Sequence, residues 1–349
     1  MAKPKQKSDG SLERFKSELK EKAPRRLYVL HGEEVYLRQH YLSRLRELLI
    51  RAGMEAFNDK LLEGKEVSAR DIIAAADCFP MMSEHTLVVV RDYDLFKANE
   101  ADRAALMSYF ADLPEYVCLV FVYDLIPYKP DARTKLAAAL KEHGLVVDFP
   151  RQEQEQLVDW IVRRFKAAGK SVDSELAKYL IFLCGDLMQD LIPEIGKIAA
   201  YAKGARVTKS DVDAVAAPRL DAVVFQLSDA VGAGQYDKAL GVLADLLHMQ
   251  EPPQLIMAAL GKYFRQLYAA RVALEERRTA DDVAGLWKMH PFVASKLMAA
   301  AHKVDLAWCR AALRRVAETD VALKTAGGDP DQTLTGVATR RLQGHVGLR

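Results

Sequence analysis

The chain has 349 residues, which at about 100–200 residues per domain is enough for two or three domains, each with its own core. Half of the residues are apolar and 28% are charged, which is typical of folded globular proteins and excludes an extensively disordered chain. Lysine and arginine (50) nearly balance aspartate and glutamate (48), so only a local basic surface could bind nucleic acid. The sequence shows no membrane-length apolar run and no apolar signal segment near its start, so the expected location is cytoplasmic.

Cysteine and histidine residues give no indication of a metal or redox site. Cys78, Cys118, Cys184 and Cys309 lie far apart, and no pair has the CxxC spacing of zinc or dithiol motifs. Their apolar neighbours predict small, buried side chains in a reducing compartment. No histidine belongs to an HExxH motif. We therefore expect no metal and no cofactor.

The first part of the chain has the pattern of an α/β domain. An amphipathic helix is expected over 11–22, because apolar residues recur there every three or four positions before Pro24. Apolar, β-branched runs then alternate with helical patterns, as is typical of parallel strands buried on both faces. The expected strands are 27–30, 86–90, 117–122 and 145–147, and the expected helices are one ending at 50, then 69–77, 98–110 and 132–143.

After Pro150 the strand signals nearly vanish, and residues that favour helices dominate. The predicted fold class is therefore α/β plus all-α. The predicted domains are 1–148 (parallel α/β), 149–217 (small and helical) and 218–349 (helical). The expected helices are 152–168, 174–183, 190–202, one starting at 208, 222–233, 236–249, 253–276, 281–287, 292–302, 305–324 and one near 332–343.

The loop after the first expected strand is the place to look for nucleotide chemistry. Many ATPases join an α/β domain to a small helical domain, and their phosphate loop needs a Gly-Lys-Ser/Thr sequence. Here Gly32 is followed by Glu33 and Glu34, two carboxylates that would repel phosphates, and the lysine is absent. Asp92 is interpreted as a solvated loop residue and Asp124 as a structural one. The sequence therefore predicts a degenerate nucleotide loop and no catalysis.

Several short motifs follow one another along residues 25–330. The first strand runs into a Gly-Glu-Glu turn at 32–34, and a Phe-Pro-Met-Met stretch at 79–82 precedes the run Leu-Val-Val-Val at 87–90. Further motif positions are Asp131, Arg133, Lys135 and Leu136, then Asp190, Leu191, Glu194, Lys197, Tyr201, Gly204 and Asp211, then 251–252, 264–267, 290–293, Asp320 and Lys324. Together these motifs resemble the delta subunit of the bacterial DNA polymerase III clamp loader. Met81 and Met82 depart from the phenylalanines common in that family.

The resemblance implies an AAA+-like α/β domain with a degenerate nucleotide site, a small helical lid and a helical C-terminal collar. In that family the subunit binds the ring-shaped sliding clamp (the beta subunit) and opens it for loading onto primed DNA. It does so without hydrolysing ATP itself. The collar joins it to the gamma/tau and delta-prime subunits of the loader. The missing phosphate loop agrees with this family.

The resemblance assigns clamp binding to the residues Phe79, Pro80, Met81 and Met82, which we call the apolar loop. Read by itself, the stretch is also compatible with a helix end whose apolar residues pack on the sheet. In the functional interpretation, Pro80 holds the turn and keeps the loop out of the sheet. Phe79, Met81 and Met82 would then insert into a pocket of the partner.

Basic and aromatic residues of the last third allow two interpretations. Arg310, Arg314 and Arg315 form a basic cluster on one expected helix. They are either part of a solvated face or contacts to DNA phosphates inside the assembled loader. Phe264 and Tyr268 share a helical face, which favours core or subunit interface over nucleic-acid stacking.

Two further hypotheses compete with the clamp-binding subunit. A divergent AAA+ ATPase would bind and hydrolyse nucleotide, which the carboxylates of the loop disfavour. A delta-prime-like subunit would carry, in many members, a zinc-binding cysteine cluster and a Ser-Arg-Cys motif. Neither feature occurs in this sequence.

Overall fold

The computed structural model describes residues 10–64, 67–232, 235–248, 252–287, 289 and 291–325. The chain divides into two compact units, Met1–Gln152 with Leu187–Gln189, and Glu153–Asp186 with Asp190–Arg349. The predicted division into three domains stays a prediction. The helix expected near 332–343 lies outside the described residues.

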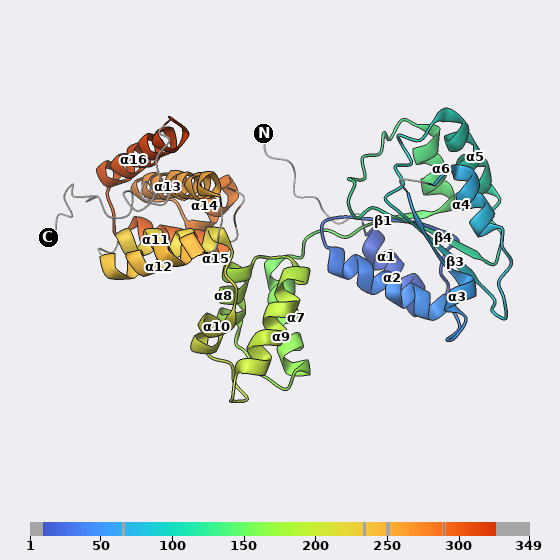
Figure 1. The fold of residues 1–349 in the computed structure, drawn as a ribbon, viewed down its shortest axis with the longest axis horizontal. Coiled ribbons are helices and arrows are strands. Elements are labelled where there is room, and N and C mark those ends of the chain that lie inside the picture. Colours follow the sequence, from blue (N-terminus) through green and yellow to red (C-terminus); the bar gives the residue numbers. More distant parts are fainter. Residues whose placement is uncertain are drawn as a thin grey trace. The chain divides into compact units, whose positions relative to one another are not determined.

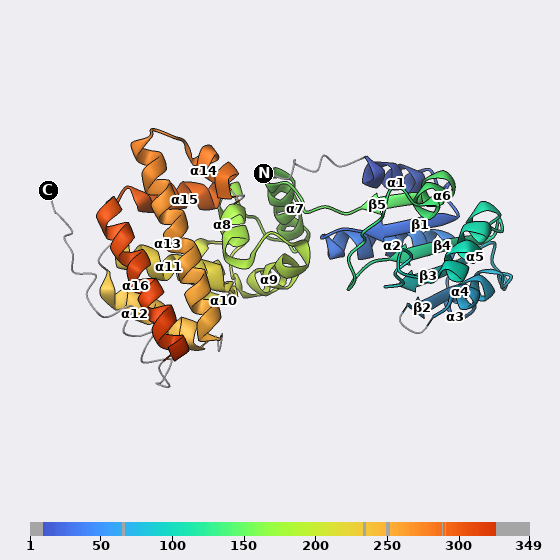
Figure 2. The ribbon, with the colours of Figure 1, turned by 90° about the horizontal axis from the view of Figure 1, so that it is seen from above.

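The first unit contains a parallel sheet (Figure 1), whose five strands have the order β2-β3-β4-β1-β5 (Figure 2). Four of these strands confirm the predicted apolar runs. The fifth was missed because Asp59, Lys60 and Glu63 make it rich in charge, as is common for a strand at the edge of a sheet. The strands are β1 (Leu27–His31), β2 (Asp59–Glu63), β3 (Thr86–Arg91), β4 (Val117–Val122) and β5 (Leu145–Asp148).

Helices cover both faces of this sheet (Figure 1). Helices α1 (Ser11–Lys20) and α2 (Val35–Leu49) pack on one face, where Phe15 and Leu45 are fully buried. Helices α4 (Ala69–Ala76), α5 (Glu100–Ala111) and α6 (Lys135–His143) pack on the other face. A single-turn helix, α3 (Glu55–Asn58), leads into β2. The buried apolar area on each face drives this layering.

Capping residues determine where the helices on the second face begin. Ser68, Asn99 and Thr134 each accept a hydrogen bond from a backbone N–H of the first turn of α4, α5 and α6. Helices α5 and α6 therefore begin two and three residues later than the apolar periodicity predicts.

The second unit contains only helices as its regular elements in the described residues, which confirms the predicted class of α/β plus all-α. Around the long helix α13, the rings of Tyr263 and Phe264 pack against Phe225 and Trp308. None of the helices described is long and apolar enough to cross a membrane. The helices are α7 (Gln154–Ala167), α8 (Ser174–Cys184), α9 (Met188–Tyr201), α10 (Lys209–Val215), α11 (Leu220–Gly232), α12 (Tyr236–His248), α13 (Pro253–Glu275), α14 (Ala280–Trp287), α15 (Pro291–Ala301) and α16 (Leu306–Thr325).

Candidate functional site

The strand order puts the switch point of the sheet, where a crevice is expected, at the carboxyl ends of β1 and β4. These two strands are neighbours, yet α2, which follows β1, and α6, which follows β4, pack on opposite faces of the sheet. In open α/β sheets a ligand binds at such a switch point. The residues of the predicted nucleotide loop therefore lie where a nucleotide would bind.

Gly32 brings the loop after β1 against the end of β5. Its φ of +120° is a conformation that favours glycine, and a Cβ at this position would lie 2.4 Å from the carbonyl oxygen of Phe149. The backbone N–H of Glu34 donates a hydrogen bond of 2.9 Å to the same oxygen. A backbone hydrogen bond thus holds the loop after β1 against the chain that follows β5.

Arg38 of α2 occupies the crevice. Its side chain is only 1% exposed. The guanidinium donates from Nη1 to the carbonyl oxygen of Gly32 at 2.6 Å, and from Nε and Nη2 to Oδ1 of Asp124 at 3.0 and 2.5 Å. The guanidinium of Arg38 therefore links the loop after β1 to the end of β4. Asp124 therefore has a structural partner, and its lack of a catalytic role stays a prediction.

Asp92, which follows β3, organises the neighbouring loop. Its Oδ1 accepts hydrogen bonds from the backbone N–H groups of Asp124, Leu125 and Ile126 at 2.9, 2.8 and 3.1 Å. Its own φ of +54° belongs to the left-handed region, which aspartate tolerates better than most residues. The expectation of a merely solvated Asp92 is wrong, because its carboxylate caps the chain leaving β4.

The two carboxylates of the predicted loop have different surroundings. The Glu33 carboxylate forms an ion pair with Arg151. The Glu34 side chain is fully buried, and its Oε2 accepts a hydrogen bond of 3.4 Å from the N–H of Met188. That the nucleotide loop is degenerate stays a prediction. The carboxylates of Glu33 and Glu34 are both engaged within the protein, so the Arg38–Asp124 pair is the stronger argument against nucleotide binding. A sequence signal for Arg38 existed, since it continues the buried stripe of Leu42, Leu45 and Leu49 at helical spacing.

The apolar loop lies between α4 and the start of β3, at the amino ends of the strands and therefore opposite the switch point. Phe79, Met81 and Met82 are 82%, 52% and 72% exposed, respectively. The alternative in which these residues pack on the sheet is therefore wrong. Large apolar side chains gathered on one exposed turn are typical of a surface that binds a partner.

Polar groups at the base of the apolar loop hold its backbone. Asn58 is fully buried, and it accepts a hydrogen bond from the N–H of Met81 at 2.7 Å and donates to its carbonyl oxygen at 2.9 Å. Thr86 donates to the carbonyl oxygen of Cys78 at 3.3 Å. Tyr116 packs its ring 5.0 Å from that of Phe79 and donates to the carbonyl oxygen of Asp77. The loop is thus preorganised, which lowers the entropy lost when it binds.

Asn58 was missed by the sequence analysis, because nothing in its neighbourhood marks a polar residue as the support of a loop 23 positions away. We expect Asn58→Ala to lower the free energy of unfolding by about 1–3 kcal/mol, since it leaves two backbone groups of Met81 without partners. Urea denaturation of the full chain measures this loss. Gln39→Ala, on the exposed side of α2, serves as the control, and an equally small effect of both substitutions would contradict the supporting role.

The prediction that all four cysteines are buried is wrong for Cys78. Cys118, Cys184 and Cys309 are buried as predicted, whereas Cys78 is exposed. Its Sγ lies 3.3 Å from the carbonyl oxygen of Ala74 in the last turn of α4. The thiol is exposed because the chain turns outward here to form the apolar loop.

The basic cluster lies on α16. Arg310, Arg314 and Arg315 are all exposed, and Arg315 lies 3.8 Å from Glu318. Phe264 is buried and Tyr268 is partly buried against the same helical core, so neither presents a free ring to a nucleic-acid base. The cluster as a DNA contact stays a prediction.

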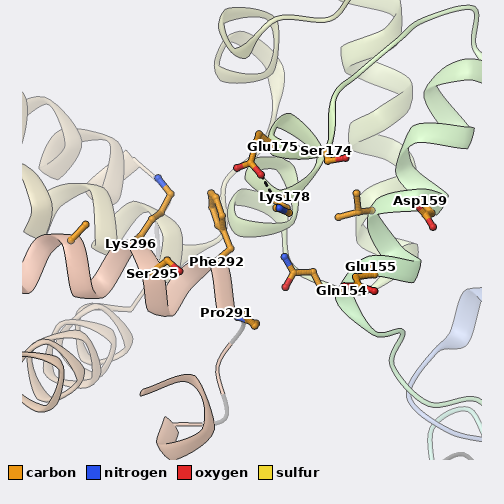
Figure 3. A pocket seen from close by; sticks show the side chains of 12 residues that line it. Gln154, Glu155, Asp159, Ser174, Glu175, Lys178, Pro291, Phe292, Ser295 and Lys296 are labelled. Atoms are coloured by element: carbon orange, nitrogen blue, oxygen red, sulfur yellow. Dashed lines mark hydrogen bonds and ion pairs between the residues drawn. The ribbon is translucent and has the colours of Figure 1, made fainter. Parts of the chain in front are cut away.

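An open pocket of about 920 Å³ lies in the second unit between α7, α8 and α15 (Figure 3). Phe292 and Lys296 line one side, and Glu175, which is paired with Lys178 at 2.7 Å, lines the other. It contains none of the predicted site residues. In the described part of the chain, no group of three or more His, Cys, Asp or Glu residues could hold a metal ion.

Fold and site together define a parallel α/β domain with an Arg38–Asp124 pair at its switch point and an exposed apolar loop, joined to an all-helical region. The sequence matches the family "DNA polymerase III, delta subunit" over residues 28–150 and "DNA polymerase III delta subunit, C-terminal domain" over residues 221–338. The chain belongs to the DNA polymerase III delta subunit family.

Individual proteins that resemble this chain carry the name of the same family. The chain is 28% identical over 311 residues to the DNA polymerase III subunit delta of Bacillus subtilis, covering 87% of this chain and 89% of that protein. It is 27% identical to the probable DNA polymerase III subunit delta of Aquifex aeolicus, covering 72% of each. The solved structure of the Bacillus subtilis DNA clamp loader delta protein (YqeN) matches with a TM-score of 0.57 and 26% identity, covering 94% of this chain and 98% of that one.

Proposed function

We propose that this chain is the clamp-loader subunit that binds the sliding clamp and holds it open for loading onto primed DNA. The single observation that carries this proposal is the exposed, preorganised apolar loop of Phe79, Pro80, Met81 and Met82. Membership in the DNA polymerase III delta family supplies the kind of partner. Pro80, which cannot donate a backbone hydrogen bond, helps keep the loop from pairing with another strand.

The apolar loop can supply enough binding free energy for a specific contact. Complete burial of an apolar side chain is worth about 1.5–3 kcal/mol, so Phe79, Met81 and Met82 together could sustain a micromolar or tighter complex. To open a ring, the loop must bind the opened form of the clamp more tightly than the closed form, since equal affinity would shift nothing.

The subunit acts without hydrolysing ATP itself. The support for this part is the Arg38–Asp124 pair, which fills the crevice that a nucleotide would enter. A divergent ATPase would have to break this buried pair on every binding event, at a cost of several kcal/mol. The energy of loading then comes from the gamma/tau subunits, which this chain joins, together with delta-prime, through its helical residues 218–349. Within that assembly, Arg310, Arg314 and Arg315 contact phosphates of the primed DNA.

The test is a surface-binding measurement of the full chain on the immobilised cognate clamp, with and without Mg-ATP. We expect saturable binding with the same affinity in both conditions, because the Arg38–Asp124 pair lies where a nucleotide would bind. Absence of binding would contradict the proposed partner. An affinity that changes with Mg-ATP would contradict the filled crevice instead.

A further inference from the structure

The apolar loop does not account for all the exposed apolar side chains of the α/β unit. Phe57, in the single-turn helix α3, is 53% exposed. In the described part of this unit, the large apolar side chains that are exposed are Phe57, Leu61, Phe79, Met81, Met82 and Leu125. Leu125 follows β4 at the carboxyl ends of the strands, whereas Phe57 precedes β2 at the amino ends, where the apolar loop precedes β3.

Hydrogen bonds hold Phe57 next to the apolar loop. Its neighbour Asn58 is bonded to both backbone groups of Met81, at 2.7 and 2.9 Å. Adjacent Cα atoms lie about 3.8 Å apart, so Phe57 is one peptide unit from that junction. The N–H groups of Phe57 and Asn58 both donate to the carbonyl oxygen of Met54, at 3.2 and 3.1 Å, which gives α3 its turn. The residue that follows Phe57 is therefore tied by hydrogen bonds to the backbone of the apolar loop.

The exposure of Phe57 contrasts with the burial of its polar neighbour Asn58. Asn58 is the residue of α3 whose side chain is fully buried. The fold thus directs a polar amide inward, to support Met81, and leaves an aromatic ring largely in water. Aromatic side chains contribute strongly to interfaces, because they bury a large area with few rotatable bonds.

We infer that Phe57 is a second anchor for the sliding clamp, which it contacts beside the apolar loop. This inference rests on the proposed function. The clamp is the partner, rather than another subunit of the loader, because Asn58 makes α3 continuous with the apolar loop. An apolar tip alone would allow a bound clamp to rotate about it. A second anchor on α3 resists that rotation and so fixes the orientation in which the clamp is held.

The test measures binding of the full chain to the immobilised cognate clamp for three forms: wild type, Phe57→Ala and the control Leu125→Ala. Truncation of an interface anchor is expected to weaken the affinity about 5- to 30-fold, and Leu125→Ala is expected to change it less than twofold. Both substituted side chains are exposed, so urea denaturation should show wild-type stability for both variants.

The possible outcomes distinguish a failure of the second anchor from a failure of the proposed function. No clamp binding by the wild type would overturn the proposed function and this inference together. Clamp binding that Phe79→Ala/Met81→Ala/Met82→Ala abolishes and Phe57→Ala leaves intact would overturn only the second anchor. A third outcome is that Phe57→Ala impairs co-purification with the gamma/tau and delta-prime subunits while clamp affinity is unchanged. That result would also overturn it, by assigning the ring to a loader interface.

Discussion

The combined substitution Phe79→Ala/Met81→Ala/Met82→Ala is expected to weaken clamp binding by about 1,000-fold, or ~4 kcal/mol. These three side chains are 82%, 52% and 72% exposed in the free chain, so their burial against the partner is available as binding free energy. Surface-binding measurements with the immobilised clamp give the change, and most of it should appear as faster dissociation.

The same substitution leaves the fold intact, which is what makes this measurement decisive. Exposed side chains away from caps and ion pairs contribute within about ±0.5 kcal/mol each to the free energy of unfolding. Asn58 bonds to the backbone of Met81, and those hydrogen bonds survive the loss of the Met81 side chain. A well-folded triple variant with wild-type affinity would exclude the apolar loop as the binding site.

The second large effect is on stability. We expect Arg38→Met to lower the free energy of unfolding by about 3 kcal/mol, because it removes the buried cation and leaves the partly exposed Asp124 with only its long contact to Arg91. Arg91 lies 3.9 Å from the other carboxylate oxygen of Asp124, at the limit of an ion pair, and does not replace the two short hydrogen bonds of Arg38. Urea denaturation followed by circular dichroism measures the loss.

Two controls identify the buried pair as the cause. Arg44→Met, on the exposed side of the same helix, removes only a surface pair with Glu47 at 3.8 Å and should cost less than about 1 kcal/mol. Arg38→Met/Asp124→Leu removes both charges, so it should be less destabilised than Arg38→Met by itself. Equal stability of Arg38→Met and Arg44→Met would refute the structural role of the pair.

Some features of this protein follow from the sequence alone, because they depend on local periodicity. The apolar runs at 86–90 and 117–122 can only be satisfied by burial on both faces, which requires a parallel sheet between helices. The helical patterns after Pro150 determine the change of fold class. The absence of a Gly-Lys-Ser/Thr sequence after Gly32 predicts the degenerate loop.

Tertiary structure decided the features that depend on contacts between distant segments. Whether Phe79, Met81 and Met82 pack inward or face solvent is not encoded in their own stretch, because Asn58 and Tyr116 hold the backbone that presents them. The charged residues of β2 gave no strand pattern in the sequence. This edge strand is instead stabilised by its pairing with β3. Arg38 and Asp124 are 86 positions apart, and only the order of the strands brings them together in the crevice.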